Sequence, residues 1–113
     1  MNIFIYQVMK LQKLQREVYN RQHQAKVCNK ICQRIAQKDY HDASILIRYY
    51  LNDKSFNWYK PIERIIENQI TNLFYDVTYH KTSCYEFFNR QYKELQEEIF
   101  YYTAQIEKIT GGN

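Results

Sequence analysis

The strongest constraint on the fold is an apolar repeat that runs unbroken through the last third of the sequence. Apolar or aromatic residues recur there at alternating steps of three and four, at Tyr85, Phe88, Tyr92, Leu95, Ile99, Tyr102, Ile106 and Ile109. This spacing places them on one face of an α-helix that packs lengthwise against another helix. Ser83 with Glu86 is a capping-box pattern, so we expect the helix to begin near Ser83 and to end before Gly111.

A second long helix is predicted at the start of the sequence, over about residues 3–38. Its apolar positions are Leu11, Leu14, Val18, Ala25, Cys28, Cys32 and Ile35. Arg21 fills the one position of this seam that is not apolar, within a polar collar over Asn20–Gln24. A helix of this length would reach about 54 Å. We therefore expect a kink or break near the collar.

Two shorter helices are predicted between these long ones. One covers roughly Ala43–Leu51, with Asp39 or Asp42 as its N-cap. The other follows Pro61, which suits the first turn of a helix because its missing N–H would be unpaired there. With only two glycines and one proline among 113 residues, the chain has little material for tight turns. The sequence therefore predicts a single all-α domain over residues 1–113, a bundle of about four helices with long first and last helices.

The net charge of +4 is uneven along the chain. Residues 1–53 have an excess of Lys and Arg, whereas the remainder is slightly acidic. Amide side chains and tyrosines lie among the basic residues of the first helix, and these side chains can bond phosphate or sugar oxygens and stack on unpaired bases. An ordinary solvated helix face is the alternative interpretation. We interpret the set as an RNA-binding surface, which consists of Lys10, Lys13, Arg16, Arg21, Lys26, Lys30 and Arg34.

One run supports this interpretation by resemblance. The sequence KLQREVY over Lys13–Tyr19 resembles the LQ-x-x-[IV]-Y signature of the N-terminal domain of group II intron reverse transcriptases, the maturases. The Lys26–Val27 pair and the run Ala43–Leu51 resemble later parts of that domain, so the resemblance covers about residues 8–52. The gap before Lys26 is shorter than in the family, the second LQ is absent, one of two arginines is a tyrosine, and no polymerase motif follows. The resemblance implies a non-catalytic relative that binds RNA or a ribonucleoprotein through Lys13, Arg16, Lys26 and Arg48.

A structural subunit of a larger assembly is the alternative function. Aromatic anchors favour protein interfaces, and the heptad seam of the last helix could face either this chain or a partner. The predicted partner interface, which would also serve self-association, consists of Tyr85, Phe88, Tyr92, Leu95, Ile99 and Tyr102.

Catalysis is not expected. The sequence has no Gly-rich phosphate loop, no nucleophile elbow and no H-E-x-x-H motif, so we predict neither an enzyme nor a cofactor. Cys28 with Cys32, and His80 with Cys84, have a spacing of four residues and could supply three thiolates and one imidazole to zinc. Core packing of the thiols is the favoured interpretation.

Three cysteines do not make a disulfide framework, which favours an intracellular reducing compartment, the cytosol or an organelle interior. The opening MNIFIYQVM is too short to span a bilayer. It also has no basic n-region and no small-residue cleavage site, so we expect neither a membrane span nor a secretory signal.

Overall fold

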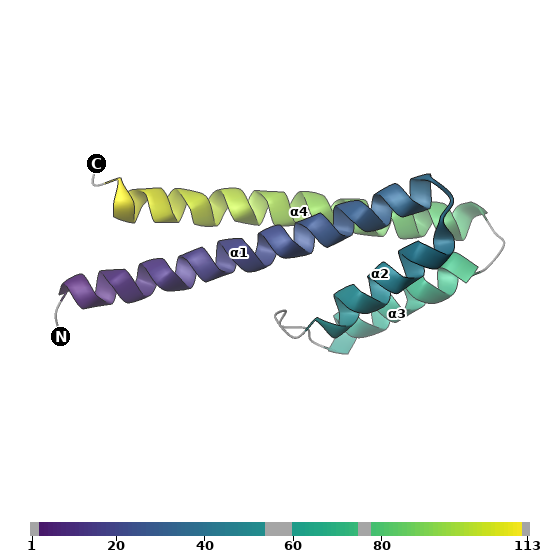
Figure 1. The fold of residues 1–113 in the computed structure, drawn as a ribbon, viewed down its shortest axis with the longest axis horizontal. Helices are drawn as coiled ribbons and strands as arrows, with labels where there is room; N and C mark the ends of the chain where they lie inside the picture. The colour runs from purple at the N-terminus through teal and green to yellow at the C-terminus, as the bar shows by residue number, and fades with distance from the viewer. Residues whose placement is uncertain (1–2, 54–59, 75–77, 112–113) are drawn as a thin grey trace.

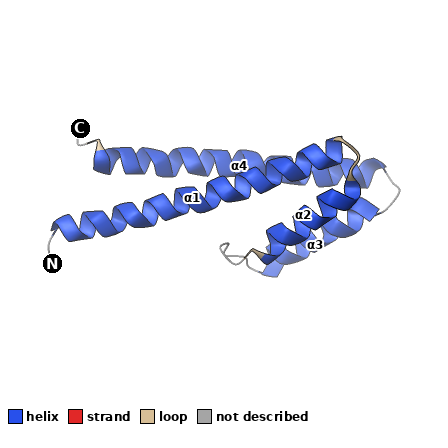
Figure 2. Ribbon diagram, in the orientation of Figure 1, coloured by secondary structure: helices blue, strands red, loops and turns tan. Residues whose placement is uncertain are grey.

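The computed structural model describes residues 3–53, 60–74 and 78–111, and these residues form helices and no strand (Figure 2). The helices are α1 (Ile3–Ala36), α2 (Tyr40–Asn52), α3 (Lys60–Phe74) and α4 (Thr78–Thr110). The prediction of an all-α bundle with long first and last helices is confirmed.

The two long helices run side by side in opposite directions, so both termini lie at one end of the molecule (Figure 1). α2 and α3 form a shorter pair that packs against the other end. The molecule is elongated, with principal extents of 60 × 25 × 19 Å. Among the described residues, no helix combines the length and apolar character needed to cross a membrane.

α1 is continuous for 34 residues, so the predicted kink near Asn20–Gln24 is wrong. The helix contains neither proline nor glycine, the usual causes of a sharp kink. It ends at Ala36, and the turn that follows contains Lys38, which has a positive φ of 62°. There the Asp39 amide donates to Arg34 O at 2.9 Å and the Lys38 amide to Ile35 O at 3.0 Å. These bonds satisfy carbonyl groups that the helix end would otherwise leave unpaired.

Asp39 is the N-cap of α2, and its Oδ1 accepts from the Asp42 amide at 3.2 Å. The helix therefore starts at Tyr40, three residues before the position that the apolar pattern indicated. α3 begins at Lys60, which confirms Pro61 in its first turn.

α4 begins at Thr78, so the start predicted near Ser83 is wrong. The Ser83–Glu86 pattern lies inside the helix, because no glycine or proline stops the helix from extending back to Thr78. The predicted end is confirmed at Thr110, where the Gly111 amide donates to Glu107 O at 2.7 Å.

The hydrophobic core occupies the half of the molecule where all the helices meet. α1 contributes buried residues only from Ala25 onward, and residues 3–24, all of which the structure describes, include none. Tyr50 of α2 and Phe88 of α4 meet there edge to face, with ring centroids 6.0 Å apart. The other buried apolar side chains are Val27, Cys28, Ile31, Cys32, Ile35, Ala43, Ile47, Ile66, Leu73, Cys84 and Leu95.

The heptad seam of α4 faces the chain itself over this length. Phe88 and Leu95 are buried in the core, and Tyr85, Tyr92 and Ile99 are partly buried against it. A partner protein would reach Phe88 or Leu95 only if α4 separated from α1.

Candidate nucleic-acid interface

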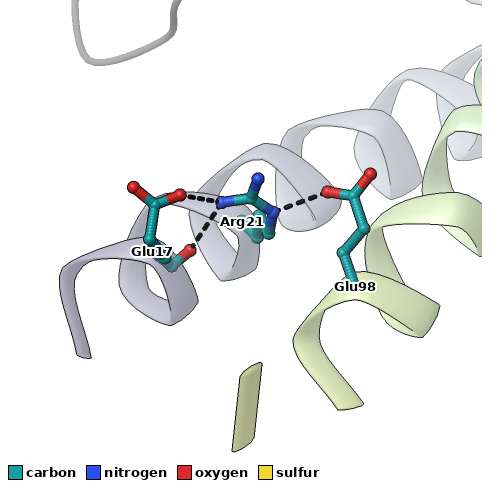
Figure 3. Close-up of polar contacts among 3 residues, drawn as sticks. All are labelled: Glu17, Arg21 and Glu98. Carbon is teal, nitrogen blue, oxygen red and sulfur yellow. Dashed lines mark hydrogen bonds and ion pairs between the residues drawn. The ribbon is translucent and has the colours of Figure 1, made fainter. Parts of the chain in front are cut away.

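Arg21, in the polar collar of α1, is engaged by carboxylates of its own chain (Figure 3). Its Nε donates to Glu98 Oε2 of α4 at 2.5 Å, and its Nη1 donates to Glu17 Oε2 at 2.5 Å and to Glu17 O at 3.3 Å. The guanidinium carbon lies 4.5 Å from the centroid of the Tyr102 ring. Burial alone would lower the pKa of Arg21, but the hydrogen bonds to Glu98 and Glu17 outweigh it and raise the pKa above its ordinary value.

His23 links the same collar to α2. Its Nε2 lies 3.0 Å from Asp53 Oδ2 and 3.3 Å from the Tyr49 hydroxyl. The imidazole also meets the Tyr49 ring edge to face, with centroids 6.1 Å apart. The polar residues in the middle of α1 therefore join this helix to α4 through Arg21 and to the α2 segment through His23.

The predicted RNA-binding residues divide into engaged and exposed groups. Arg21 is engaged as above, and Arg34 Nε forms an ion pair with Asp42 Oδ2 at 2.6 Å. The others are exposed and form no ion pair within the part of the chain that the structure describes; they are Lys10, Lys13, Arg16, Lys26, Lys30 and Arg48.

The exposed basic residues lie in three places. Arg16, Lys26 and Lys30 lie on one face of α1 together with Tyr19 and His23, which follow one another at steps of three, four, three and four. His23, in the middle of this face, contacts Asp53 of the α2 segment. We call this face the outer face of α1. Lys10 and Lys13 line a groove at the terminal end of the molecule, and Arg48 lies on α2 beside Glu67 of α3.

A groove of about 340 Å³, lined by both polar and apolar side chains, adjoins the outer face beside Lys26. Its lining includes Gln22 and Asn29 of α1 and Gln96 of α4, and we call it the amide groove. Side-chain amides offer donors and acceptors suited to phosphate and sugar oxygens. Sequence reasoning missed Gln96, because only the packing of α4 against α1 brings it next to Lys26.

The three cysteines are buried in the core. Burial raises the pKa of Cys28 and Cys84 to about 12 and that of Cys32 to about 11, so the thiols stay protonated near neutral pH. Cys32 Sγ lies 3.7 Å from Tyr85 O, a weak hydrogen bond. The side chain of His80 lies outside the described residues. Among those described, no three His, Cys, Asp or Glu side chains come together as metal ligands.

Comparison of the chain with family models, with curated proteins and with solved structures found no match. The resemblance to the maturase domain stays a prediction, and two of its four matched basic positions, Arg16 and Lys26, lie on the outer face of α1.

Proposed function

We propose that this is an intracellular, non-enzymatic protein that binds RNA, alone or within a ribonucleoprotein, through the outer face of α1. One observation carries the proposal. Glu17 is the only acidic residue of α1, and it is turned toward Arg21, away from the outer face. Arg16, Lys26 and Lys30 therefore present positive charge with no carboxylate of the same helix beside them. The α2 segment brings the carboxylate of Asp53 to this face, where it is paired with His23. Basic residues of this kind neutralise phosphates and release condensed counterions.

The geometry of the outer face suits a single strand. Arg16 and Lys30 are about 21 Å apart along the helix axis, long enough to follow several successive phosphates. Tyr19 lies between them with 70% of its surface exposed, so its ring is available for stacking on an unpaired base. The amide groove beside Lys26 provides neutral hydrogen-bonding groups for sugar hydroxyls.

Fluorescence anisotropy with a labelled single-stranded RNA, measured over a range of salt concentrations, tests this proposal. The variant Lys26→Glu with Lys30→Glu should bind more weakly at every salt concentration. Its log–log salt dependence should be shallower by about 1.4, because two phosphate contacts are lost. The matched control is Lys93→Glu with Lys108→Glu, the same charge change at exposed positions of α4. Equal weakening by both variants would show that only net charge matters and would refute a site on α1.

The second candidate is a structural subunit of a larger assembly. It is favoured by the exposed apolar side chains on the first turns of α1, among them Ile3, Ile5 and Met9. RNA crosslinking in cells with mapping of the attached peptides distinguishes the two functions. If no peptide from residues 10–50 carries a nucleotide, the subunit function is the better explanation.

A further inference from the structure

Two adjoining grooves follow one side of the α1–α4 pair toward the end where the termini lie. The first, of about 870 Å³, is lined on α1 mainly by Tyr6, Met9, Lys10 and Lys13. The second, of about 430 Å³, is lined on α4 mainly by Glu94, Glu97, Glu98 and Tyr101. Tyr102 lines both grooves, so they form one continuous surface, which we call the trough.

The trough exposes large apolar side chains. Met9 keeps 61% of its surface exposed, Tyr6 56% and Tyr101 59%. Contiguous exposed apolar surface on a small protein indicates a binding site. Because the buried core begins only at Ala25, these side chains contribute little to the stability of the single chain.

Glu17, Arg21 and Glu98 line the middle of the trough and pair with one another. The remaining charges of the trough are separated along its length. Lys10 and Lys13 stand at the terminal end, and Glu94 and Glu97 stand toward the core. All four are exposed, and none forms an ion pair within the described ranges. A surface that is basic at one end and acidic at the other is complementary to a copy of itself turned by 180°.

The helix register permits both charge pairs at once. α1 and α4 are antiparallel. Going along the molecule from its terminal end toward the core, Lys13 therefore follows Lys10 by three residues on α1, and Glu94 follows Glu97 by three residues on α4. One two-fold axis that sets Lys10 against Glu94 of a second copy therefore also sets Lys13 against Glu97. Since Arg21 faces Glu98, Glu94 lies at about the level of residue 25 of α1. The axis then falls midway between that level and Lys10.

This midpoint lies beside Glu17 and Val18. Tyr102 comes four residues after Glu98 on α4, so it lies level with the residue four positions before Arg21 on α1, which is Glu17. Tyr102 is also the residue at which the two grooves meet. The symmetry axis demanded by the charges thus coincides with the centre of the trough.

We propose that two copies of this chain associate trough to trough about a two-fold axis near Tyr102. Lys10 and Lys13 of each copy lie against Glu94 and Glu97 of the other. Tyr101 and Tyr102 lie at the centre of the interface, and Met9 and Tyr6 lie beyond the charge pairs, toward its two ends. In such an interface every contact occurs twice. A specific interface of this kind buries about 800 Å² on each partner, near a tenth of the 8254 Å² of this chain. The outer face of α1 is not part of the trough, so this inference does not depend on RNA binding.

Sedimentation equilibrium of the full chain without RNA tests the proposal. The wild type should approach twice its 14.0 kDa mass with rising concentration. Lys10→Glu with Lys13→Glu sets like charges against each other and should raise the dissociation constant at least about tenfold. Adding Glu94→Lys with Glu97→Lys to that variant should restore the dimer, because the charge pairs are then rebuilt in reverse.

The matched control is Lys26→Glu with Lys30→Glu, the same charge change on the outer face of α1, which should leave the dimer intact. Under the proposed function this control variant binds RNA more weakly but still dimerises. The proposals of RNA binding and of dimerisation can therefore fail separately. The substituted residues are all exposed, and circular dichroism verifies that each variant stays helical. A wild type that stays monomeric, whether or not it binds lipid vesicles or another protein, overturns the inference. So does a fourfold variant that fails to dimerise.

Discussion

Arg21→Ala and Arg21→Leu should differ sharply in stability, because Arg21 occupies an apolar seam position but engages two carboxylates. Its side chain is 22% exposed, and those of Glu17 and Glu98 are 34% and 49% exposed. Solvent screens both ion pairs, so each contributes about 0.5 kcal/mol. The stacking on Tyr102 adds about 0.5–1 kcal/mol. With the packing of the aliphatic stem, truncation to Ala should cost about 2 kcal/mol.

Arg21→Leu should stay within about 0.5 kcal/mol of the wild type, or exceed it. Leucine continues the apolar seam, and Glu98 remains accessible to water, so no unpaired charge is buried. Replacement of an ion pair by a well-packed apolar residue is often neutral or stabilising.

Chemical and thermal denaturation of the two variants and the wild type provide the measurement. For a chain of this length, the loss in Arg21→Ala corresponds to a Tm lower by about 8 °C. A loss in Arg21→Leu as large as that in Arg21→Ala would refute the reasoning, because it would show that the ionic contacts, not the filled volume, stabilise this position. RNA affinity should change little in Arg21→Leu. A large loss of affinity at unchanged stability would instead make Arg21 part of the RNA-binding surface.

Three further predictions concern the end of α1, the start of α2 and the core thiols. Lys38→Gly should raise the free energy of unfolding by about 0.5 kcal/mol, because glycine adopts the positive φ of this position without steric cost. Urea denaturation measures this free energy. Asp39→Ala should lower the free energy of unfolding by about 1 kcal/mol, because the N-cap of α2 is lost. Asp39→Asn keeps a capping oxygen, so its free energy of unfolding should fall much less. The buried thiols of Cys28, Cys32 and Cys84 have a raised pKa, so well below pH 9.0 they are protonated in both the native and the unfolded chain and leave the stability unchanged. As pH rises through 9.0 toward about 11 and 12, the unfolded chain releases protons that the native chain retains, and the Tm should fall with pH more steeply than in a variant with alanine at the three positions.

The helices could be predicted from the sequence because their apolar spacing is maintained over many turns. The eight-residue seam from Tyr85 to Ile109 leaves no other regular structure that would bury these side chains on one face. Helix starts were predicted less well. The Ser83–Glu86 pattern is a local signal that also occurs within helices, so it could not show that α4 extends back to Thr78.

The division of the basic residues could not be predicted from the sequence. Arg21 can reach Glu17 on its own helix, but its second carboxylate partner, Glu98, is 77 positions away in the chain. The relative register of α1 and α4 decides that contact, and the apolar seams alone allow several registers. The same register brings Gln96 beside Lys26. The charge asymmetry indicated which helix carries the positive charge, but not which of its residues face α4.

The confinement of the core to one end leaves the length of the α1–α4 pair unconstrained. Residues 3–24 of α1 contribute no buried side chain. Insertion or deletion of seven residues in each helix would extend or shorten the pair by about 10 Å and turn the side chains beyond it by only about 20°. The length of the α1–α4 pair can thus vary without changing the buried core. Insertions and deletions, instead of substitutions, could adapt such a chain to longer or shorter binding partners.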